Sequence, residues 1–141
     1  MRYHVVAVGR IRNAALRAAG DEYLSRLRHY TKIEEREVKD EARLSEAIAG
    51  ATRLVALSRL GEPWSSPELA QRTARWDQEG REVAFAIGGA DGLPHEVVER
   101  AESVWSLSAL TFPHELARVI VLEQLYRAFT IRRGEPYHRG G

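Results

Sequence analysis

Residues 104–133 read VWSLSALTFPHELARVIVLEQLYRAFTIRR, and three features follow one another in this stretch. Apolar residues 104–107 predict a short strand, and residues 108–111 form a loop of mostly small side chains. Pro113 then lies in the first turn of a predicted long helix that reaches about Arg132. A strand, a loop of small residues and a long helix in succession are typical of α/β proteins.

Outward from this stretch, apolar runs alternate with helical patterns along the whole chain. We predict strands at residues 3–8, 33–38, 53–57, 82–87 and 104–107. We predict helices that begin at Asn13, Glu41 (closed by Gly50), Ser66-Pro67-Glu68 (closed by Gly80), Pro94 and Pro113. This alternation predicts an α/β fold with a mostly parallel sheet and helices on both faces. No repeat or linker interrupts it, so we expect residues 1–141 to form a single domain.

The composition excludes several classes of protein. The chain has no cysteine, which rules out a disulfide framework and a thiolate metal site. Its histidines are scattered, so we expect no metal. The N-terminal MRYHVVAVG predicts a strand rather than a signal peptide, and no apolar run is long enough to span a bilayer. We therefore expect a soluble cytoplasmic protein that does not contact a membrane.

The predicted last helix is apolar around a full turn. Residues 119–122 are all apolar, and Leu116, Leu125, Tyr126 and Phe129 extend that surface. A surface helix would keep a polar face, so this helix is expected to be buried on more than one side. The second partner could be another copy of the chain, which predicts a symmetric homodimer. The alternative is that the helix lies deep within its own fold.

Three loops are candidates for a ligand site, at residues 58–65, 88–93 and 108–113. In open α/β sheets the ligand crevice lies beyond the carboxyl ends of the strands, where these loops are predicted. Glycine lets the backbone approach a ligand closely, as at Gly88 and Gly89. The alternative for any one loop is a simple turn.

Motifs that would specify the ligand are missing. The chain has no G-x-G-x-x-G after the first strand, no phosphate-binding P-loop, no G-x-S-x-G elbow and no H-E-x-x-H pair. Its C-terminal end is basic, with Arg132, Arg133, His138 and Arg139 against Glu135, while the net charge is only +1. The residues alone therefore indicate a small-ligand α/β domain with a basic tail.

The stretch from Val104 to Arg139 closely resembles the C-terminal signature of the RlmH family. Members of this family are SPOUT-superfamily enzymes that methylate N3 of a pseudouridine in 23S ribosomal RNA. Further matches are VAVG (6–9), EYL (22–24), GEPWSSPELA (61–70) and IGGADG (87–92). The likeness spans nearly the whole chain. The chain departs from it by a shorter segment between about Val38 and Leu44 and by two extra glycines at its end.

The resemblance implies a C-terminal trefoil knot and an S-adenosylmethionine site built from the three loops. The cofactor-binding residues that it implies are Leu57, Gly88, Gly89, Leu107, Ser108, Ala109, Leu110, Thr111 and Phe112. It also implies a homodimer that acts on 23S ribosomal RNA within the ribosome. Two other functions stay open: a non-catalytic knotted RNA-binding module, and a small-metabolite α/β enzyme.

The candidate catalytic residues lie near the C-terminus. Tyr137, His138 and Arg139 match the family's C-terminal motif, which resembles a tail reaching the cofactor pocket of the partner protomer. Tyr137 could stack on a base and His138 could take a proton. Arg139 or Arg127 could stabilise negative charge or hold a phosphate. The alternatives are a frayed tail and, for Arg127, a salt bridge with Glu123 four residues earlier.

Four other residues that could suggest a site have simpler interpretations. Trp64, Trp76 and Trp105 are expected in the core or an interface rather than as platforms for bases. His114, at the start of the last helix, is expected to pack or cap that helix rather than to bind a metal.

Overall fold

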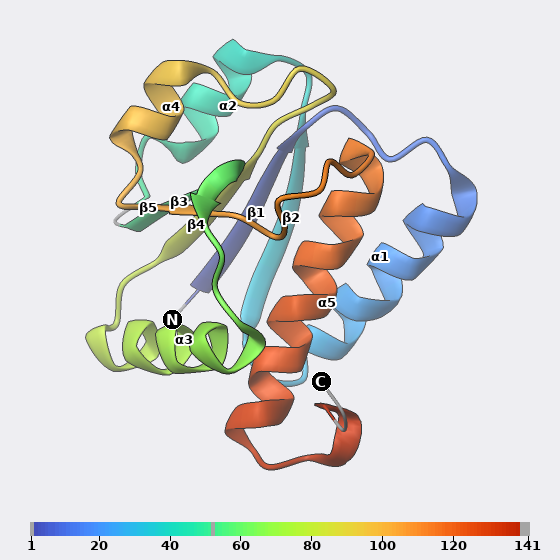
Figure 1. Ribbon diagram of the computed structural model, residues 1–141, viewed down its shortest axis with the longest axis vertical. Coiled ribbons are helices and arrows are strands. Elements are labelled where there is room, and N and C mark those ends of the chain that lie inside the picture. The colour runs from blue at the N-terminus through green and yellow to red at the C-terminus, as the bar shows by residue number, and fades with distance from the viewer. Residues whose placement is uncertain (1, 52, 139–141) are drawn as a thin grey trace.

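A five-stranded sheet forms the centre of the molecule, and all of its strands pair in parallel (Figure 1). The structure is a computed structural model that describes residues 2–51 and 53–138. The strands are β1 (Arg2–Val8), β2 (Lys32–Val38), β3 (Arg53–Glu62), β4 (Val83–Ile87) and β5 (Ser103–Trp105). Their order across the sheet is β2-β1-β4-β3-β5. The predicted α/β fold with a parallel sheet is confirmed.

Helices cover both faces of the sheet (Figure 1). One face carries α1 (Ala14–Leu27), α3 (Ser66–Glu79) and α5 (His114–Arg132), and the other carries α2 (Glu41–Ile48) and α4 (His95–Arg100). Successive strand residues point to opposite faces, so Val5 packs beneath α5 while its neighbour Val6 packs beneath α2. A short 3-10 helix, η1 (Pro136–His138), follows α5. Within the described ranges, no helix has the length and apolar character needed to cross a membrane.

Strand β3 is longer than predicted. The sequence predicted a strand that ends at Leu57 and a loop over residues 58–65, whereas β3 continues to Glu62. After an irregularity in the register, Glu62 pairs with Trp105 of β5. Gly61 permits this pairing, because a Cβ atom there would lie 2.5 Å from the carbonyl oxygen of Val104. Periodicity could not predict the extension, since its pairing partner is a distant strand.

Most predicted helix ends are confirmed, and three differ. Asn13 caps α1 by accepting the N–H of Leu16, and Gly80 ends α3 in the left-handed conformation. Ser65, rather than Ser66, caps α3, because its hydroxyl accepts the N–H of Glu68. The other two differences are at the end of α2, where right-handed Ala49 replaces the predicted Gly50, and before α5, where Pro113 precedes the first turn instead of lying in it.

Helix α5 is buried on several sides by its own chain. It lies between α1 and α3 and packs on the sheet (Figure 1). Val121, Leu122 and Leu125 are fully buried there, and Leu122 lies against Gly20 of α1. Burial of α5 within its own fold is therefore sufficient to explain its apolar residues. The helix pattern alone does not require a second copy of the chain.

Replacing Gly61 with alanine should destabilise the protein, because the new methyl group would push against the backbone of Val104 and separate β3 from β5. We expect Gly61→Ala to lower the free energy of unfolding by about 1–3 kcal/mol, measured by urea denaturation. Gly50→Ala is the matched control, since no atom lies within 4 Å of its new Cβ. Its stability should change by less than about 1 kcal/mol. Equal effects of the two substitutions would contradict the proposed contact.

Candidate functional site

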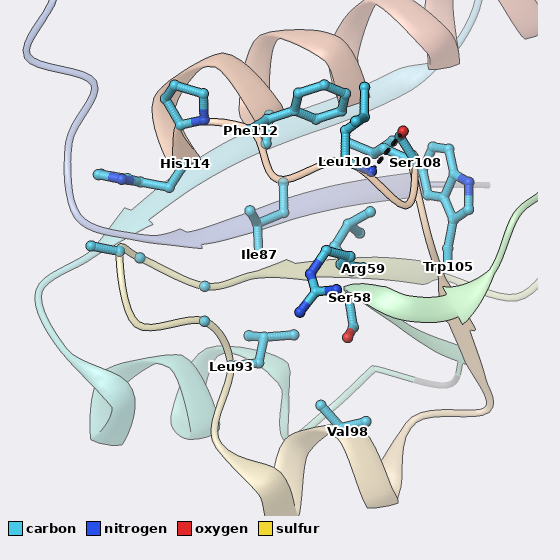
Figure 2. A pocket seen from close by; sticks show the side chains of 18 residues that line it. Ser58, Arg59, Ile87, Leu93, Val98, Trp105, Ser108, Leu110, Phe112 and His114 are labelled. Atoms are coloured by element: carbon cyan, nitrogen blue, oxygen red, sulfur yellow. Dashed lines mark hydrogen bonds between the residues drawn. The ribbon is translucent and has the colours of Figure 1, made fainter.

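A pocket of about 580 Å³ opens where β4 and β5 end, beside the middle of β3 (Figure 2). The strand order places β3 between β4 and β5, so the segments that follow β4 and β5 lie on either side of residues 57–59 of β3. The volume is within the roughly 300–1,000 Å³ that is usual for small-molecule sites. The residues that line it are Leu57, Ser58, Arg59, Ile87, Gly88, Gly89, Ala90, Gly92, Leu93, Val98, Trp105, Leu107, Ser108, Leu110, Phe112, Pro113, His114 and Ala117.

The wall after β4 is a tight turn made almost entirely of backbone. The N–H of Gly92 donates to the carbonyl of Gly89 at 3.0 Å, and Gly92 adopts a φ of 79°. A Cβ atom on Gly88 would lie 2.3 Å from the carbonyl carbon of Gly92. Glycine at Gly88 is therefore required to close the turn, which leaves peptide groups facing the pocket.

The wall after β5 is held by two serines. The hydroxyl of Ser106 donates to the carbonyl of Ser108 at 3.0 Å, and the hydroxyl of Ser108 accepts the N–H of Leu110, also at 3.0 Å. These bonds fold the segment back toward the pocket, where Leu110 remains 69% exposed. Pro113 then ends the loop and α5 begins, with His114 facing the pocket (Figure 2).

The interior of the pocket is apolar. Trp105 lies at its base, almost completely buried and stacked on Trp64 with ring centroids 5.4 Å apart. Ile87, Leu93 and Val98 add aliphatic surface (Figure 2). An apolar interior edged by peptide groups suits a flat heterocycle, whose faces are apolar and whose edges carry donors and acceptors.

Arg59 contributes the only lysine or arginine side chain among the lining residues. It lies in the last part of β3, next to Ser58, and its side chain is exposed. The pocket therefore combines an apolar interior with one fixed positive charge. An anionic group of a ligand could pair with that charge.

The structure brings together most of the residues predicted to bind a cofactor. All of them line the pocket except Ala109 and Thr111, which lie in the same loop between lining residues. Arg59, Trp105, Val98 and His114 also line the pocket, although the sequence did not predict them individually as pocket residues. Arg59 belongs to the segment 58–65, which the sequence did predict as part of the site. His114 lines the pocket, and α5 has no side-chain cap at its start, which corrects its expected capping role.

The candidate catalytic residues lie elsewhere. Tyr137 packs against Tyr126, with ring centroids 4.6 Å apart, and its hydroxyl donates to Glu123 at 2.9 Å. The same carboxylate pairs with Arg127 at 2.9 Å, which is the salt bridge considered as an alternative. None of these residues lines the pocket. Helix α5 is about 28 Å long at 1.5 Å per residue, and its first turn meets the pocket while its end precedes the tail (Figure 1).

Tyr137 is held in its protonated form. Burial raises the pKa of its hydroxyl above the ordinary value, and hydrogen bonding with Tyr23 and Glu123 raises it further. The hydroxyl is therefore a donor at neutral pH. Backbone alone is described for His138, and the predicted Arg139 lies outside the described residues. Among the described residues, no group of three or more histidine, cysteine, aspartate and glutamate side chains could hold a metal ion.

Comparison of the sequence with known families gives one match over almost the whole chain. The family described as "Predicted SPOUT methyltransferase" matches residues 1–138. A relative from Sorangium cellulosum, named ribosomal RNA large subunit methyltransferase H, is 49% identical over 97% of this chain and 99% of its own. A relative of the same name from Anaeromyxobacter is 44% identical over 99% of this chain and 100% of its own.

Solved structures show the same fold at low sequence identity. A probable methylase family protein from Haemophilus influenzae has a TM-score of 0.64 at 12% identity, covering 96% of this chain and 69% of that one. A methyltransferase from Legionella pneumophila, solved with bound S-adenosylmethionine, has a TM-score of 0.51 at 12% identity, covering 91% and 66%. Together with the family match and the close relatives, these likenesses identify the chain as a member of the SPOUT methyltransferase family and, within it, of the RlmH family.

Proposed function

We propose that residues 1–141 form one SPOUT-type domain that transfers a methyl group from S-adenosylmethionine to N3 of a pseudouridine in 23S ribosomal RNA. The pocket beside β3, at the ends of β4 and β5, carries this proposal, because its volume and its lining residues suit a nucleoside-like ligand. The names of the relatives indicate that the substrate is large-subunit ribosomal RNA, and the resemblance to the RlmH family indicates the position of the methyl group. The reaction would take place in the cytoplasm, on the ribosome.

The residues present fit S-adenosylmethionine. Gly88, Gly89 and Gly92 line the pocket without side chains, so their peptide groups can contact the adenine edge directly. Trp105, Ile87 and Leu93 would hold the flat ring between apolar surfaces. When bound, the cofactor supplies a methyl group on a positively charged sulfur, which a nucleophilic nitrogen can displace. The protein mainly has to hold the two reactants in line.

The acceptor nitrogen carries a proton that has to leave. We propose His138 as the group that takes this proton, with Arg139 stabilising the negative charge that develops on the base. Arg127 is a weaker candidate than the sequence indicated, since its guanidinium is already paired with Glu123. Tyr137, a donor held by the same carboxylate, would position the tail.

A homodimer would bring the tail and the pocket together. Within one chain the pocket meets the first turn of α5, whereas Tyr137 is held farther along that helix, at Glu123 and Tyr126. We propose that a twofold axis places the tail of one protomer at the pocket of its partner.

We also propose the knot that the resemblance implies. Support comes from the contact of two segments that are distant in sequence, since the N–H of Ser106 donates to the carbonyl of Glu62 at 2.8 Å. The chain after β5 therefore passes directly against the end of β3 before α5 begins. In a trefoil knot, α5 would pass through the loop that follows β3, which would keep the walls of the pocket in contact.

Incubation with labelled S-adenosylmethionine and ribosomes from a strain that lacks this methyltransferase tests the proposed activity. We expect one methyl group on a pseudouridine of 23S RNA, located by mass spectrometry, and none on free nucleosides. Gly88→Ala should abolish donor binding and transfer because its methyl group breaks the turn, while Gly50→Ala should leave both unchanged. Donor binding without transfer would indicate a non-catalytic RNA-binding module, and methylation of a small metabolite would reject the RNA substrate.

Arg59 is exposed at the pocket and is expected to contact a phosphate of the RNA rather than the carboxylate of the donor. Arg59→Gln should therefore raise KM for the ribosomal substrate and lower the dependence of log KM on log salt by about one unit. Calorimetric titration should give the wild-type Kd for S-adenosylmethionine when RNA is absent. A weaker donor Kd without RNA would assign Arg59 to the carboxylate instead.

Mixing two inactive variants tests whether the site is shared between protomers. One variant carries Gly88→Ala in the pocket, and the other ends at Pro136 and so lacks the tail. If each pocket uses the partner's tail, random pairing should restore about a quarter of the wild-type activity. Two affinity tags would verify that mixed dimers form. Mixed dimers without activity would show that each site is built by one chain.

A further inference from the structure

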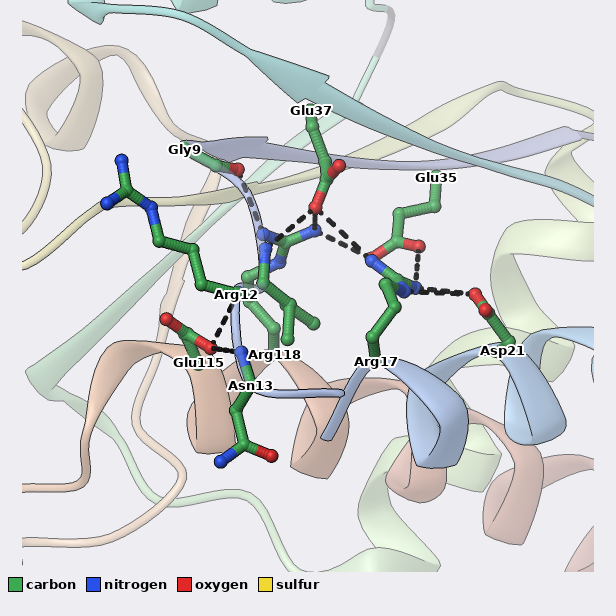
Figure 3. Close-up of polar contacts among 10 residues, drawn as sticks. Gly9, Arg12, Asn13, Arg17, Asp21, Glu35, Glu37, Glu115 and Arg118 are labelled. Atoms are coloured by element: carbon green, nitrogen blue, oxygen red, sulfur yellow. Dashed lines mark hydrogen bonds and ion pairs between the residues drawn. The ribbon is translucent and has the colours of Figure 1, made fainter. Parts of the chain in front are cut away.

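A buried ion-pair cluster joins the first turns of α5 to β2, to α1 and to the segment between β1 and α1 (Figure 3). Arg118 of α5 is its centre, and its side chain is only 1% exposed. One end of its guanidinium donates to Glu35 at 2.8 Å and to Glu37 at 2.7 Å. The other end donates to the carbonyl of Gly9 at 3.0 Å. Glu35 and Glu37 lie two residues apart on β2, so both carboxylates point to the same face.

The cluster also holds the segment between β1 and α1. Glu37 accepts the N–H of Ile11 at 3.1 Å in addition to the bond from Arg118. Burial alone would raise the pKa of the Glu37 carboxyl, but the hydrogen bonds from Arg118 and Ile11 lower it below its ordinary value. Glu115, one turn before Arg118, accepts the N–H groups of Arg12 and Asn13. Helix α5 is thus bonded to this segment along its first turns.

The two segments that Arg118 joins, the start of α5 and the backbone at Gly9, each adjoin a wall of the pocket. On its own helix, Ala117 precedes Arg118 directly and lines the pocket, and the wall after β5 enters α5 just before it. On the other side, Val8 precedes Gly9, and its carbonyl lies 3.6 Å from where a Cβ atom of Gly89 would stand. A rigid contact between Gly9 and Arg118 therefore sets the spacing between the wall at Gly89 and the start of α5.

Stability alone does not account for a buried arginine at this place. Removing a charge from water is costly, and apolar side chains of similar volume often replace buried ion pairs without loss of stability. The Nε of Arg118 is buried and lacks a hydrogen-bond partner among the described residues. What an apolar side chain could not supply is a simultaneous bond to β2 and to the carbonyl of Gly9.

We infer that Arg118 is a positioning residue that holds the walls after β4 and β5 at the separation required by the methyl donor. This inference rests on the proposed function for its ligand. Arg118 does not line the pocket, so it acts through Gly9 and through the first turn of α5. It should govern donor affinity more than the rate at saturating donor.

Arg17 provides a matched control. It pairs with the same two carboxylates, Glu35 at 2.6 Å and Glu37 at 3.2 Å, but it belongs to α1 and, within the part of the chain that the structure describes, bonds to neither Gly9 nor α5. Arg17→Met should therefore remove comparable ion pairs and lower Tm while leaving the donor Kd within twofold of the wild type. Arg118→Met should raise the donor Kd and donor KM by about tenfold, with kcat at saturating donor almost unchanged.

Arg118→Lys keeps the charge but cannot span both sides of the contact, so its donor Kd should lie between those of the wild type and Arg118→Met. If Arg118→Met fails to fold, the donor Kd of Arg118→Lys tests the inference in its place. An unchanged donor Kd in folded Arg118→Met or Arg118→Lys, or equal losses in Arg17→Met, would overturn the inference.

Hydrogen exchange without any ligand separates this inference from the proposed function. We expect faster amide exchange at residues 88–92 and 107–112 in Arg118→Lys, and wild-type exchange there in Arg17→Met. Those changes would support the positioning role even if the wild type failed to bind S-adenosylmethionine, a result that would reject only the proposed donor. Unchanged exchange at both walls would reject the positioning role whatever the protein binds.

Discussion

The parallel pairing of β4, β3 and β5 is the constraint on which the candidate site depends. Parallel neighbours end at the same edge of the sheet, so the segments after Ile87 and Trp105 meet there, on either side of Leu57, Ser58 and Arg59 of β3. Because helices cover both faces of the sheet, this edge is where a ligand can reach the strands. The pocket is therefore a consequence of strand order, and glycines and serines determine its shape.

The two ends of α5 have different roles in this account. Its first turns form part of the pocket and carry Arg118, which bonds to the backbone of Gly9 and to β2. Its middle and second half carry Glu123 and Arg127; Glu123 binds the hydroxyl of Tyr137 and pairs with Arg127. The separation of these regions along one helix is the physical reason for proposing that a second chain completes the site.

The sequence predicted the strands, the helices and the edge of the sheet where the pocket lies. Local patterns suffice for these features, since Asn13 and Gly80 act through neighbouring residues and apolar runs identify buried strands. Features that depend on distant partners could not be predicted. The extension of β3 requires Trp105, and the cluster at Arg118 requires Glu35 and Glu37, which the sequence shows only as a charged strand.

A crystal structure with S-adenosylmethionine tests the central claim most directly. The account predicts the adenine ring between the glycine turn at 88–92 and the loop at 107–112, with backbone groups of both segments bonded to its edge. It also predicts the methyl group directed toward the tail of a symmetry-related copy. A donor bound elsewhere, or a pocket filled by its own side chains in the presence of donor, would contradict the account.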